Sequence, residues 1–494
     1  MMLSFTFTHA QVAADTLSIA KKLKDKDQLK EAFALLSDFQ KNHPDNLNAI
    51  WLSAQVAFWM HHIKTSEMLY EKAITANPKN YYLKLDFAKM LANAGEFDSA
   101  LSLLNIYLAY DPTNADAWLT ITKIYYWQGN YNKAFTMAEN IVKHNPNNKD
   151  AIDLLNDIMG AKSPWIKLNA DYNSDDQPLK SIAPSIEAGV FLHPLANLHF
   201  SGSAPFFIQN DSASHAFIFQ AGIKSDFNKE EIVTDISAGI ANFPYKNSVA
   251  FIGGIAFEKT FIQHLLLTAQ ATRSPYFYSL SSIDTELVDN NYTASIAWKN
   301  QFTINGNAGY SINQFADGNI VSTFYAGIFS PLFKKQKLDF QFGYGYNYSN
   351  AKQNEFEPKQ TLAEIISSPG SNIAGIYNPY FTPDDQQIHS VIITADYHPT
   401  KKITMGASAN YGFYATTQDP YFSLITQGTS ITGVSKSYAQ QKFSPVQAGY
   451  YILYQLSKKT ILKASYQYHQ TFFYTNNYVG ISLKTSFWNE KKKE

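Results

Sequence analysis

The spacing of apolar residues changes once along the chain, from a helical period to a strand period. In the first part, prolines recur every 34 residues, at Pro44, Pro78, Pro112 and Pro146. A small residue stands twelve positions before each proline: Ala32, Ser66, Ala100 and Ala134. Small residues let two helices cross closely, and a proline ends the second helix because it cannot continue the hydrogen-bond ladder. The pattern predicts repeated helical hairpins over 13–162, with a capping helix at 149–160.

These units resemble tetratricopeptide repeats, and Trp118, Tyr125 and Gly129 of the last unit stand where that family places them. The resemblance implies an α-solenoid whose concave face is built from the first helix of each unit. That face is expected to hold a partner's extended peptide or an emerging glycan, with Trp and Tyr as flat stacking surfaces. For the aromatic members, packing between helices is the alternative role. The 34-residue register places these residues in the groove: Asn48, Gln55, Trp59, Tyr82, Lys89, Asn93, Asp116, Lys123, Tyr126 and Trp127.

After residue 162, apolar and polar residues alternate. In Leu338–Tyr348 every second residue is Leu, Phe or Tyr, and the residues between them are Asp, Gln, Gly or Asn. Strands have a period of two, so this alternation predicts strands with one apolar face. Sixteen such segments follow one another: 165–173, 181–193, 196–207, 215–226, 231–242, 248–259, 262–273, 291–299, 301–313, 320–332, 337–349, 388–397, 401–415, 443–456, 459–470 and 476–487.

Two architectures fit such strands, a soluble sandwich or propeller and a transmembrane barrel. The segments have the length of tilted membrane-spanning strands, which need about 9–11 residues. Their connections alternate between tight turns and longer polar loops, as in outer-membrane barrels. We therefore predict an antiparallel transmembrane β-barrel of about 16 strands over 163–488, in a bacterial outer membrane. An even strand number returns the chain end to the periplasm, on the side of the repeats.

The strand faces without aromatic residues are expected to line the lumen, with Gly, Ser, Asn, Thr, Gln and single charges. The lumen-facing prediction names these polar residues: Lys224, Asp235, Lys299, Asn305, Asn307, Asp339, Gln341, Asn347, Asp396, Asn410, Lys463, Gln467 and Lys484. The loop 350–387 is long enough to be functional. It is expected to gate the pore through Glu355, Glu357, Tyr377, Tyr380 and Phe381. Surface decoration is the alternative, and the loop 416–442 could play either part.

The chain ends and the composition narrow the function classes. Residues 1–12 are interpreted as the remnant of a signal peptide, and 489–494 as a polar periplasmic tail. With 40 basic and 41 acidic residues the chain is nearly neutral, which argues against a nucleic-acid partner. The absence of cysteine excludes a thiolate nucleophile and cysteine-ligated metal sites. His199 and His469 share the lumen parity but stand at opposite strand ends, so no cofactor, metal or catalytic set is expected.

Periplasmic tetratricopeptide repeats ahead of a barrel of this size resemble bacterial exopolysaccharide export porins of the cellulose, poly-N-acetylglucosamine and Pel types. A second resemblance is to the YaiO-type outer-membrane barrel. The first implies a channel for a polysaccharide chain, with repeats that recruit synthase components or modifying enzymes, and assembly in outer-membrane lipid by the barrel assembly machinery. The lumen set lacks an arginine ladder, which favours a neutral polymer. The alternatives are a plugged barrel that anchors a repeat scaffold, a small-solute porin, or a barrel enzyme.

Overall fold

The computed structural model describes residues 15–60, 62–176, 179–209, 212–227, 231–243, 248–261, 265–299, 304–367, 373–428 and 430–489. The chain forms two compact units, a helical one that ends at Ile158 and a β unit over Met159–Asn489. Their division falls inside a helix, just before the expected boundary at 162. The expected signal remnant 1–12 and tail residues 490–494 lie outside the described residues.

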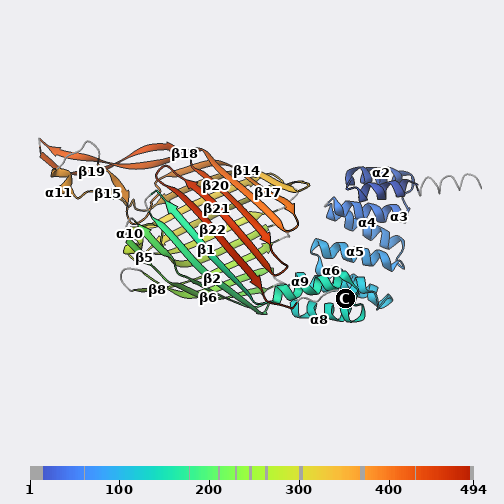
Figure 1. The fold of residues 1–494 in the computed structure, drawn as a ribbon. Coiled ribbons are helices and arrows are strands. Elements are labelled where there is room, and N and C mark those ends of the chain that lie inside the picture. Colours follow the sequence, from blue (N-terminus) through green and yellow to red (C-terminus); the bar gives the residue numbers. More distant parts are fainter. Residues whose placement is uncertain are drawn as a thin grey trace, which may run out of the picture. The chain divides into compact units, whose positions relative to one another are not determined.

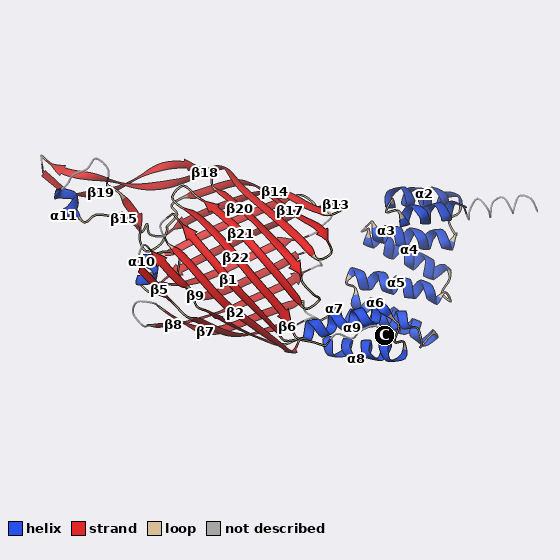
Figure 2. Cartoon of the chain, in the orientation of Figure 1, coloured by secondary structure: helices blue, strands red, loops and turns tan. Residues whose placement is uncertain are grey.

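The helical unit consists of paired helices, as the 34-residue period predicts (Figures 1 and 2). Each recurring proline lies two residues after the last residue of a second helix, at α2, α4, α6 and α8. The side chains of Asn46 and Asn114 accept hydrogen bonds from backbone N–H groups of the helices they precede, which caps α3 and α7. Residues 15–25 are also helical, and the others are α2 (Leu29–Asn42), α3 (Leu47–Trp59), α4 (Ile63–Ala76), α5 (Tyr81–Ala94), α6 (Phe97–Tyr110), α7 (Ala115–Trp127), α8 (Tyr131–His144) and α9 (Lys149–Lys162).

The small residues of the repeat are the points of closest helix packing. Ala32, Ser66, Ala100 and Ala134 are each fully buried. The Ser66 hydroxyl satisfies its hydrogen-bonding capacity by donating to the carbonyl of Ala54, 2.7 Å away on the partner helix. Tyr70 and Tyr107 fill the spaces between successive helices. The tetratricopeptide-repeat solenoid that the sequence predicts is therefore confirmed.

The β unit is a closed antiparallel barrel, because β1 pairs with β2 on one side and with β22, the last strand, on the other. Among the described residues, sixteen strands make up the wall, as predicted. They are β1 (Trp165–Asp175), β2 (Lys180–His193), β3 (Ala196–Ser203), β6 (Ile218–Phe227), β7 (Ile232–Asn242), β8 (Val249–Phe261), β9 (Leu265–Pro275), β10 (Val288–Trp298), β11 (Asn305–Phe315), β12 (Ile320–Phe329), β14 (Leu338–Ala351), β17 (Gln386–Thr400), β18 (Ile403–Gln427), β20 (Val446–Gln455), β21 (Thr460–Gln470) and β22 (Thr475–Ser486).

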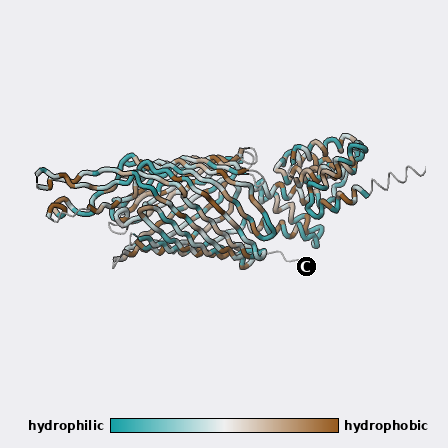
Figure 3. The backbone as a smooth tube through the Cα atoms, turned by 90° about the horizontal axis from the view of Figure 1, so that it is seen from above, coloured by the Kyte–Doolittle hydropathy of each residue, from teal (hydrophilic) through white to brown (hydrophobic). Residues whose placement is uncertain are grey.

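The outer face of the barrel is apolar. Ile255, Phe342 and Ile481 each leave about half of their surface exposed on it, and Figure 3 shows hydrophobic and hydrophilic residues alternating along the strands. A wall of exposed Ile, Leu, Phe and Tyr is unfavourable in water and suits the hydrocarbon of a bilayer. No helix among the described residues is long and apolar enough to cross a lipid bilayer.

The connections differ at the two ends of the barrel. We call the end where β1 begins the turn end and the opposite end the loop end. Tight links such as 194–195 and 401–402 lie at the turn end, and the long links lie at the loop end. The loop-end links contain β4 (Phe206–Gln209), β5 (Ser212–His215), α10 (Leu280–Asp284), β15 (Phe356–Pro358), α11 (Leu362–Ser367) and β16 (Gly375–Tyr377), and a turn-end link contains β13 (Phe333–Lys335).

The expected loop over 416–442 is largely wrong. β18 continues past the barrel wall to Gln427 and pairs with β19 (Ser430–Phe443), from Ala415↔Phe443 to Gln427↔Ser430. The two strands satisfy each other's backbone groups, so this ribbon needs no neighbour in the wall. Figure 1 shows it projecting beyond the other strands, next to α11 and β15.

Candidate functional site

The strand register places the predicted lumen residues on one face of the wall. Lys224 pairs with Asp235, Asp339 with Asp396, and Gln447 with Asn410, always on the face opposite to the exposed apolar residues. The same pairing carries Asn305, Asn307, Gln341, Asn347, Lys463, Gln467 and Lys484 to this inner face. Lys299 directly follows β10 and lines a cavity with Asn305 and Asn307.

Many charged side chains of the inner wall lie on β1 to β7 and on β17 to β22. Lys167 Nζ lies 2.9 Å from Glu187 Oε1 between β1 and β2. The Tyr451 hydroxyl donates to Asp396 Oδ1 at 2.6 Å. Lys463 and Lys484, of β21 and β22, lie over the rings of Tyr451 and Trp165. The sector from β17 through β22 to β7 therefore has a polar surface in which Lys167 is ion-paired and Lys463 and Lys484 cover aromatic rings.

The opposite sector is uncharged. The inner positions of β11 and β12, and those of β14 after Asp339, hold Asn, Gln, Ser, Thr, Gly, Ala, Val, Tyr and Phe. Amides and hydroxyls here offer exchangeable hydrogen bonds, and no fixed charge binds a passing solute tightly. The lumen thus has two walls of different chemistry, a distinction that the residue list from the sequence does not contain.

The connection between β14 and β17, residues 352–385, crosses the loop end. We call it the arm. Tyr380 of the arm is 2 % exposed, and its ring stacks on Phe315 with centroids 3.7 Å apart. Its hydroxyl donates to Asp317 Oδ2 at 2.6 Å. Burial, followed by this bond, raises the pKa of Tyr380, so the hydroxyl remains a donor. The hydroxyl of Ser279, in the β9–β10 connection, donates to the Pro379 carbonyl at 2.5 Å.

The same arm also contacts the other side of the mouth. The rings of Phe381 and Phe473 stack with centroids 3.9 Å apart, and Tyr377 contacts Phe473 at 5.8 Å. Phe473 belongs to the β21–β22 connection. The β9–β10 and β21–β22 connections are separated by half of the sixteen strands and so face each other across the barrel. The aromatic lid, defined as Tyr276, Tyr377, Tyr380, Phe381 and Phe473, therefore spans the mouth.

The outer part of the arm is held by the projecting ribbon. Phe356 stacks on Phe422 of β18 at 5.3 Å, and Lys436 Nζ of β19 donates to the Asn354 carbonyl at 3.1 Å. Glu355 lies between these contacts, where burial and then nearby Asp317 raise the pKa of its carboxyl. Glu357 accepts a hydrogen bond from the Asn378 amide. Of the five residues predicted to gate the pore, three lie in the lid and the two glutamates brace the arm.

Sequence reasoning did not find Tyr276, Phe315 and Phe473, the ring partners of the arm. A signal was present, because each stands in or beside another loop-end connection rich in aromatic residues. The pairing itself joins residues far apart in the chain and could not be read from the spacing.

Cavities beneath the lid border the uncharged wall and also reach a charged residue each, Asp175 in the first and Lys299 in the second. One of about 550 Å³ is lined by lid residues Tyr377 and Phe381 and by Asn307, Tyr325 and Phe329. A second, of about 750 Å³ at the turn end, shares Asn307, Tyr325 and Phe329 with the first. The two cavities therefore adjoin, and together they extend from the lid to the turn end.

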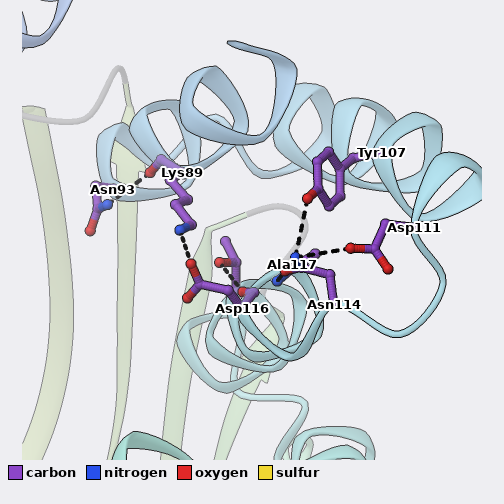
Figure 4. A network of polar contacts seen from close by, with 8 residues as sticks. Lys89, Asn93, Tyr107, Asp111, Asn114, Asp116 and Ala117 are labelled. Atoms are coloured by element: carbon purple, nitrogen blue, oxygen red, sulfur yellow. Dashed lines mark hydrogen bonds and ion pairs between the residues drawn. The ribbon is translucent and has the colours of Figure 1, made fainter. Parts of the chain in front are cut away.

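The predicted groove residues of the repeats lie on α3, α5 and α7. Lys89 of α5 forms an ion pair with Asp116 of α7, and Asn93 donates to the Lys89 carbonyl at 2.7 Å (Figure 4). Trp59, Tyr82 and Trp127 are exposed large rings. Asn48 is exposed, and Lys123 and Tyr126 are partly exposed, on the same helices.

Sequence reasoning also missed the polar centre of this surface. Asp86 Oδ2 accepts hydrogen bonds from Trp51 Nε1 at 2.5 Å, Gln55 Nε2 at 2.8 Å and the Tyr70 hydroxyl at 2.6 Å. Burial raises the pKa of Tyr70, which therefore stays protonated and donates. Gln55 also accepts from Lys24. Asp86 thus joins two successive repeats, and Gln55 is partly used in packing.

The two lumen histidines lie in separate places. His199 Nε2 is 2.9 Å from Asp235 Oδ1, and His469 contacts the ring of Tyr474 near the lid. The part of the chain that the structure describes contains no group of three or more His, Asp or Glu side chains arranged to hold a metal ion.

Comparison with known proteins places the repeats in a family. The family model of the tetratricopeptide repeat matches residues 94–158. A search of curated proteins finds no match. Among solved structures, the chain is similar to a bacterial polysaccharide outer membrane secretin, at 10% identity over 66% of this chain and 99% of that one, with a TM-score of 0.48.

Two further structures are similar to parts of the chain. A loop-deletion mutant of OmpT, an outer membrane protein of Vibrio cholerae, is 9% identical over 66% of this chain and 98% of its own, with a TM-score of 0.32. YrrB, a tetratricopeptide-repeat protein with an unusual peptide-binding site, is 17% identical over 30% of this chain and 76% of its own, with a TM-score of 0.25. The chain combines tetratricopeptide repeats with an outer-membrane-type β-barrel, and its closed, outwardly apolar wall supports a location in an outer membrane.

Proposed function

We propose that this chain is an outer-membrane channel that exports a neutral polysaccharide. The observation that carries the proposal is the uncharged inner surface of β11, β12 and the part of β14 after Asp339, which lines the cavities beneath the lid; Lys299 and Asp339 lie at its turn end. A hydrated glycan exchanges hydrogen bonds with amides and hydroxyls as it moves, and a wall without fixed charge does not trap it. A polyanion would instead favour a lumen with a continuous basic surface, whereas on the other wall Lys167 is paired with Glu187 and the register sets Lys224 beside Asp235.

In this proposal the repeats lie in the periplasm. Both β1 and β22 reach the turn end, so the helical unit and the chain end attach there. In outer-membrane barrels the short turns face the periplasm and the long loops face outward. The repeats would recruit synthase components or modifying enzymes through α3, α5 and α7, with Trp59, Tyr82 and Trp127 as exposed contacts. We propose no enzymatic activity for the chain.

A second candidate rests on the aromatic lid. The burial of Tyr380 and its stacking on Phe315 favour a closed mouth. A barrel that stays closed would serve as an anchor for a periplasmic repeat scaffold, without transport.

The two functions differ in where polysaccharide accumulates. A deletion strain is complemented with the full chain, and glycan is measured in the medium and in the periplasm. If the chain exports glycan, the deletion strain should have no glycan in the medium and should accumulate it in the periplasm. The full chain should restore secretion. Secreted glycan that does not change on deletion would refute export and favour the anchor.

A further inference from the structure

Two aromatic residues on the uncharged wall lie over glycines of the neighbouring strands. Tyr325 of β12 pairs with Gly309 of β11, and Phe329 pairs with Gly343 of β14. A Cβ atom built on Gly309 would lie 2.4 Å from Cζ of Tyr325, and one on Gly343 would lie 2.4 Å from Cδ1 of Phe329. Each ring therefore occupies the space that a side chain of its cross-strand partner would fill.

Rings in this position lie flat against the wall. Gly309 is buried under Tyr325, whereas Tyr325 and Phe329 are themselves only partly buried. One face of each ring thus covers the backbone and the other is turned to the lumen. Gly327, between them on β12, leaves room for Phe329, whose Cε2 would lie 2.8 Å from a Cβ there. The rings are fixed before any solute arrives, which lowers the entropy lost on binding.

Aromatic rings also lie over glycines on the charged wall, but there lysine side chains cover the rings. Tyr451 lies over Gly406 and Trp165 over Gly189. There, Lys463 Nζ lies 5.4 Å from the Tyr451 ring centroid and Lys484 Nζ lies 4.3 Å from that of Trp165. Ammonium groups therefore occupy those ring faces. The inner cross-strand partners of Tyr325 and Phe329 are all uncharged, so the lumen side of each ring is available to a solute; Lys299 lines the turn-end cavity with them.

Tyr325 and Phe329, the two open rings, form a line of aromatic side chains that extends toward the lid. They are four residues apart on one strand, which is about 13 Å. Both line the cavity beneath the lid and the cavity at the turn end, and the former also contains Phe381 and Phe473. Asn347 is the direct strand partner of Tyr325, and Asn307 that of Gly327, so an amide stands beside each ring.

We propose that Tyr325 and Phe329 form a stacking track for uncharged pyranose rings, which leads to Phe381 and Phe473 of the lid. The axial C–H face of a pyranose is apolar and packs on an aromatic ring, while its equatorial hydroxyls bond to amides such as Asn307 and Asn347. This inference deepens the proposed export function and rests on it for the physiological substrate, but sugar binding can be measured without export.

The test is to measure by calorimetry the binding of cellohexaose and of maltohexaose to the purified full chain in detergent. This measurement does not require the channel to conduct. The double variant Tyr325→Ala/Phe329→Ala removes both open rings. The control, Phe324→Ala/Ile328→Ala, removes the adjacent side chains of the same strand, which lie on the outer face. We expect the inner variant to bind at least one hexasaccharide about tenfold more weakly and the outer variant to bind as the parent does.

A conservative pair separates binding from folding. Tyr325→Phe/Phe329→Tyr keeps both rings and should retain binding, and it should bind equally at low and high salt because stacking is not screened. Failure of the parent to bind either sugar, or unchanged binding by the inner variant, would overturn the track. Loss of secretion in the deletion strain with unchanged binding in the inner variant would reject the track and keep export. Sugar binding that depends on the two rings, without a secretion defect in the deletion strain, would keep the track and reject export.

Discussion

The aromatic lid should open when Tyr380 is truncated. Tyr380 is a fully buried aromatic residue of the arm, it stacks on Phe315 and it donates to Asp317. Truncation of a buried aromatic ring to alanine costs about 3–5 kcal/mol. Because each 1.4 kcal/mol is a factor of ten, Tyr380→Ala should shift the balance between closed and open lid by a factor of about 10² to 4 × 10³.

A smaller change isolates the hydroxyl. Tyr380→Phe keeps the stacking on Phe315 and loses the hydroxyl with its bond to Asp317, which is worth about 1–3 kcal/mol. Its effect on the lid should therefore lie between those of the parent and Tyr380→Ala. Tyr421→Ala is the matched control, since Tyr421 is a loop-end tyrosine of the projecting ribbon that is 48% exposed and is not part of the lid.

The assay is single-channel conductance of the full chain in planar bilayers. The open fraction should rise in the order parent, Tyr380→Phe, Tyr380→Ala, and Tyr421→Ala should match the parent. Because the chain has no cysteine, labelling of an Asn307→Cys variant by a polar maleimide gives a second measure of access to the lumen. Equal conductance and equal labelling in all of these proteins would refute a lid held by Tyr380.

Three further predictions concern the repeats, the wall and the arm. Asp86→Ala should lower the free energy of unfolding of the full chain by about 1–3 kcal/mol, since it leaves the buried Tyr70 hydroxyl without its acceptor, and urea unfolding followed by tryptophan fluorescence measures this. Ile255→Lys, on the outer face, should cost about 2–4 kcal/mol in folding into lipid vesicles, whereas Ala256→Lys, its inner neighbour, should be tolerated; equal losses would contradict the assigned faces. Burial raises the pKa of Glu355 above its usual value, so the folded arm binds the proton more tightly than an unfolded arm does. The arm should therefore be most stable at acidic pH and should loosen as pH rises through the raised pKa. Channel conductance should fall on acidification.

Periodicity alone determined both units of this protein. The 34-residue spacing of the prolines reflects the covalent length of one helical hairpin, and the two-residue alternation reflects the pleat of a strand, so both are properties of local backbone geometry. The same alternation also assigned the inner and outer faces, because once one side chain of a strand is placed on a face, every second residue lies on that face. The sixteen-strand count and the sides of the connections followed from the same information.

Only the tertiary structure decided how distant residues meet. The β18–β19 ribbon lies in the segment that the sequence pattern assigns to a loop, 416–442, although its two strands pair with each other. Tyr380 reaches Asp317, 63 residues away, and Phe381 reaches Phe473 across the mouth. The orientation of the Tyr325 ring, which lies flat against the wall, depends on a glycine in the neighbouring strand. Such contacts depend on strand register and loop path, which a spacing pattern does not encode, and they determine whether the lumen is open, closed or lined for a sugar.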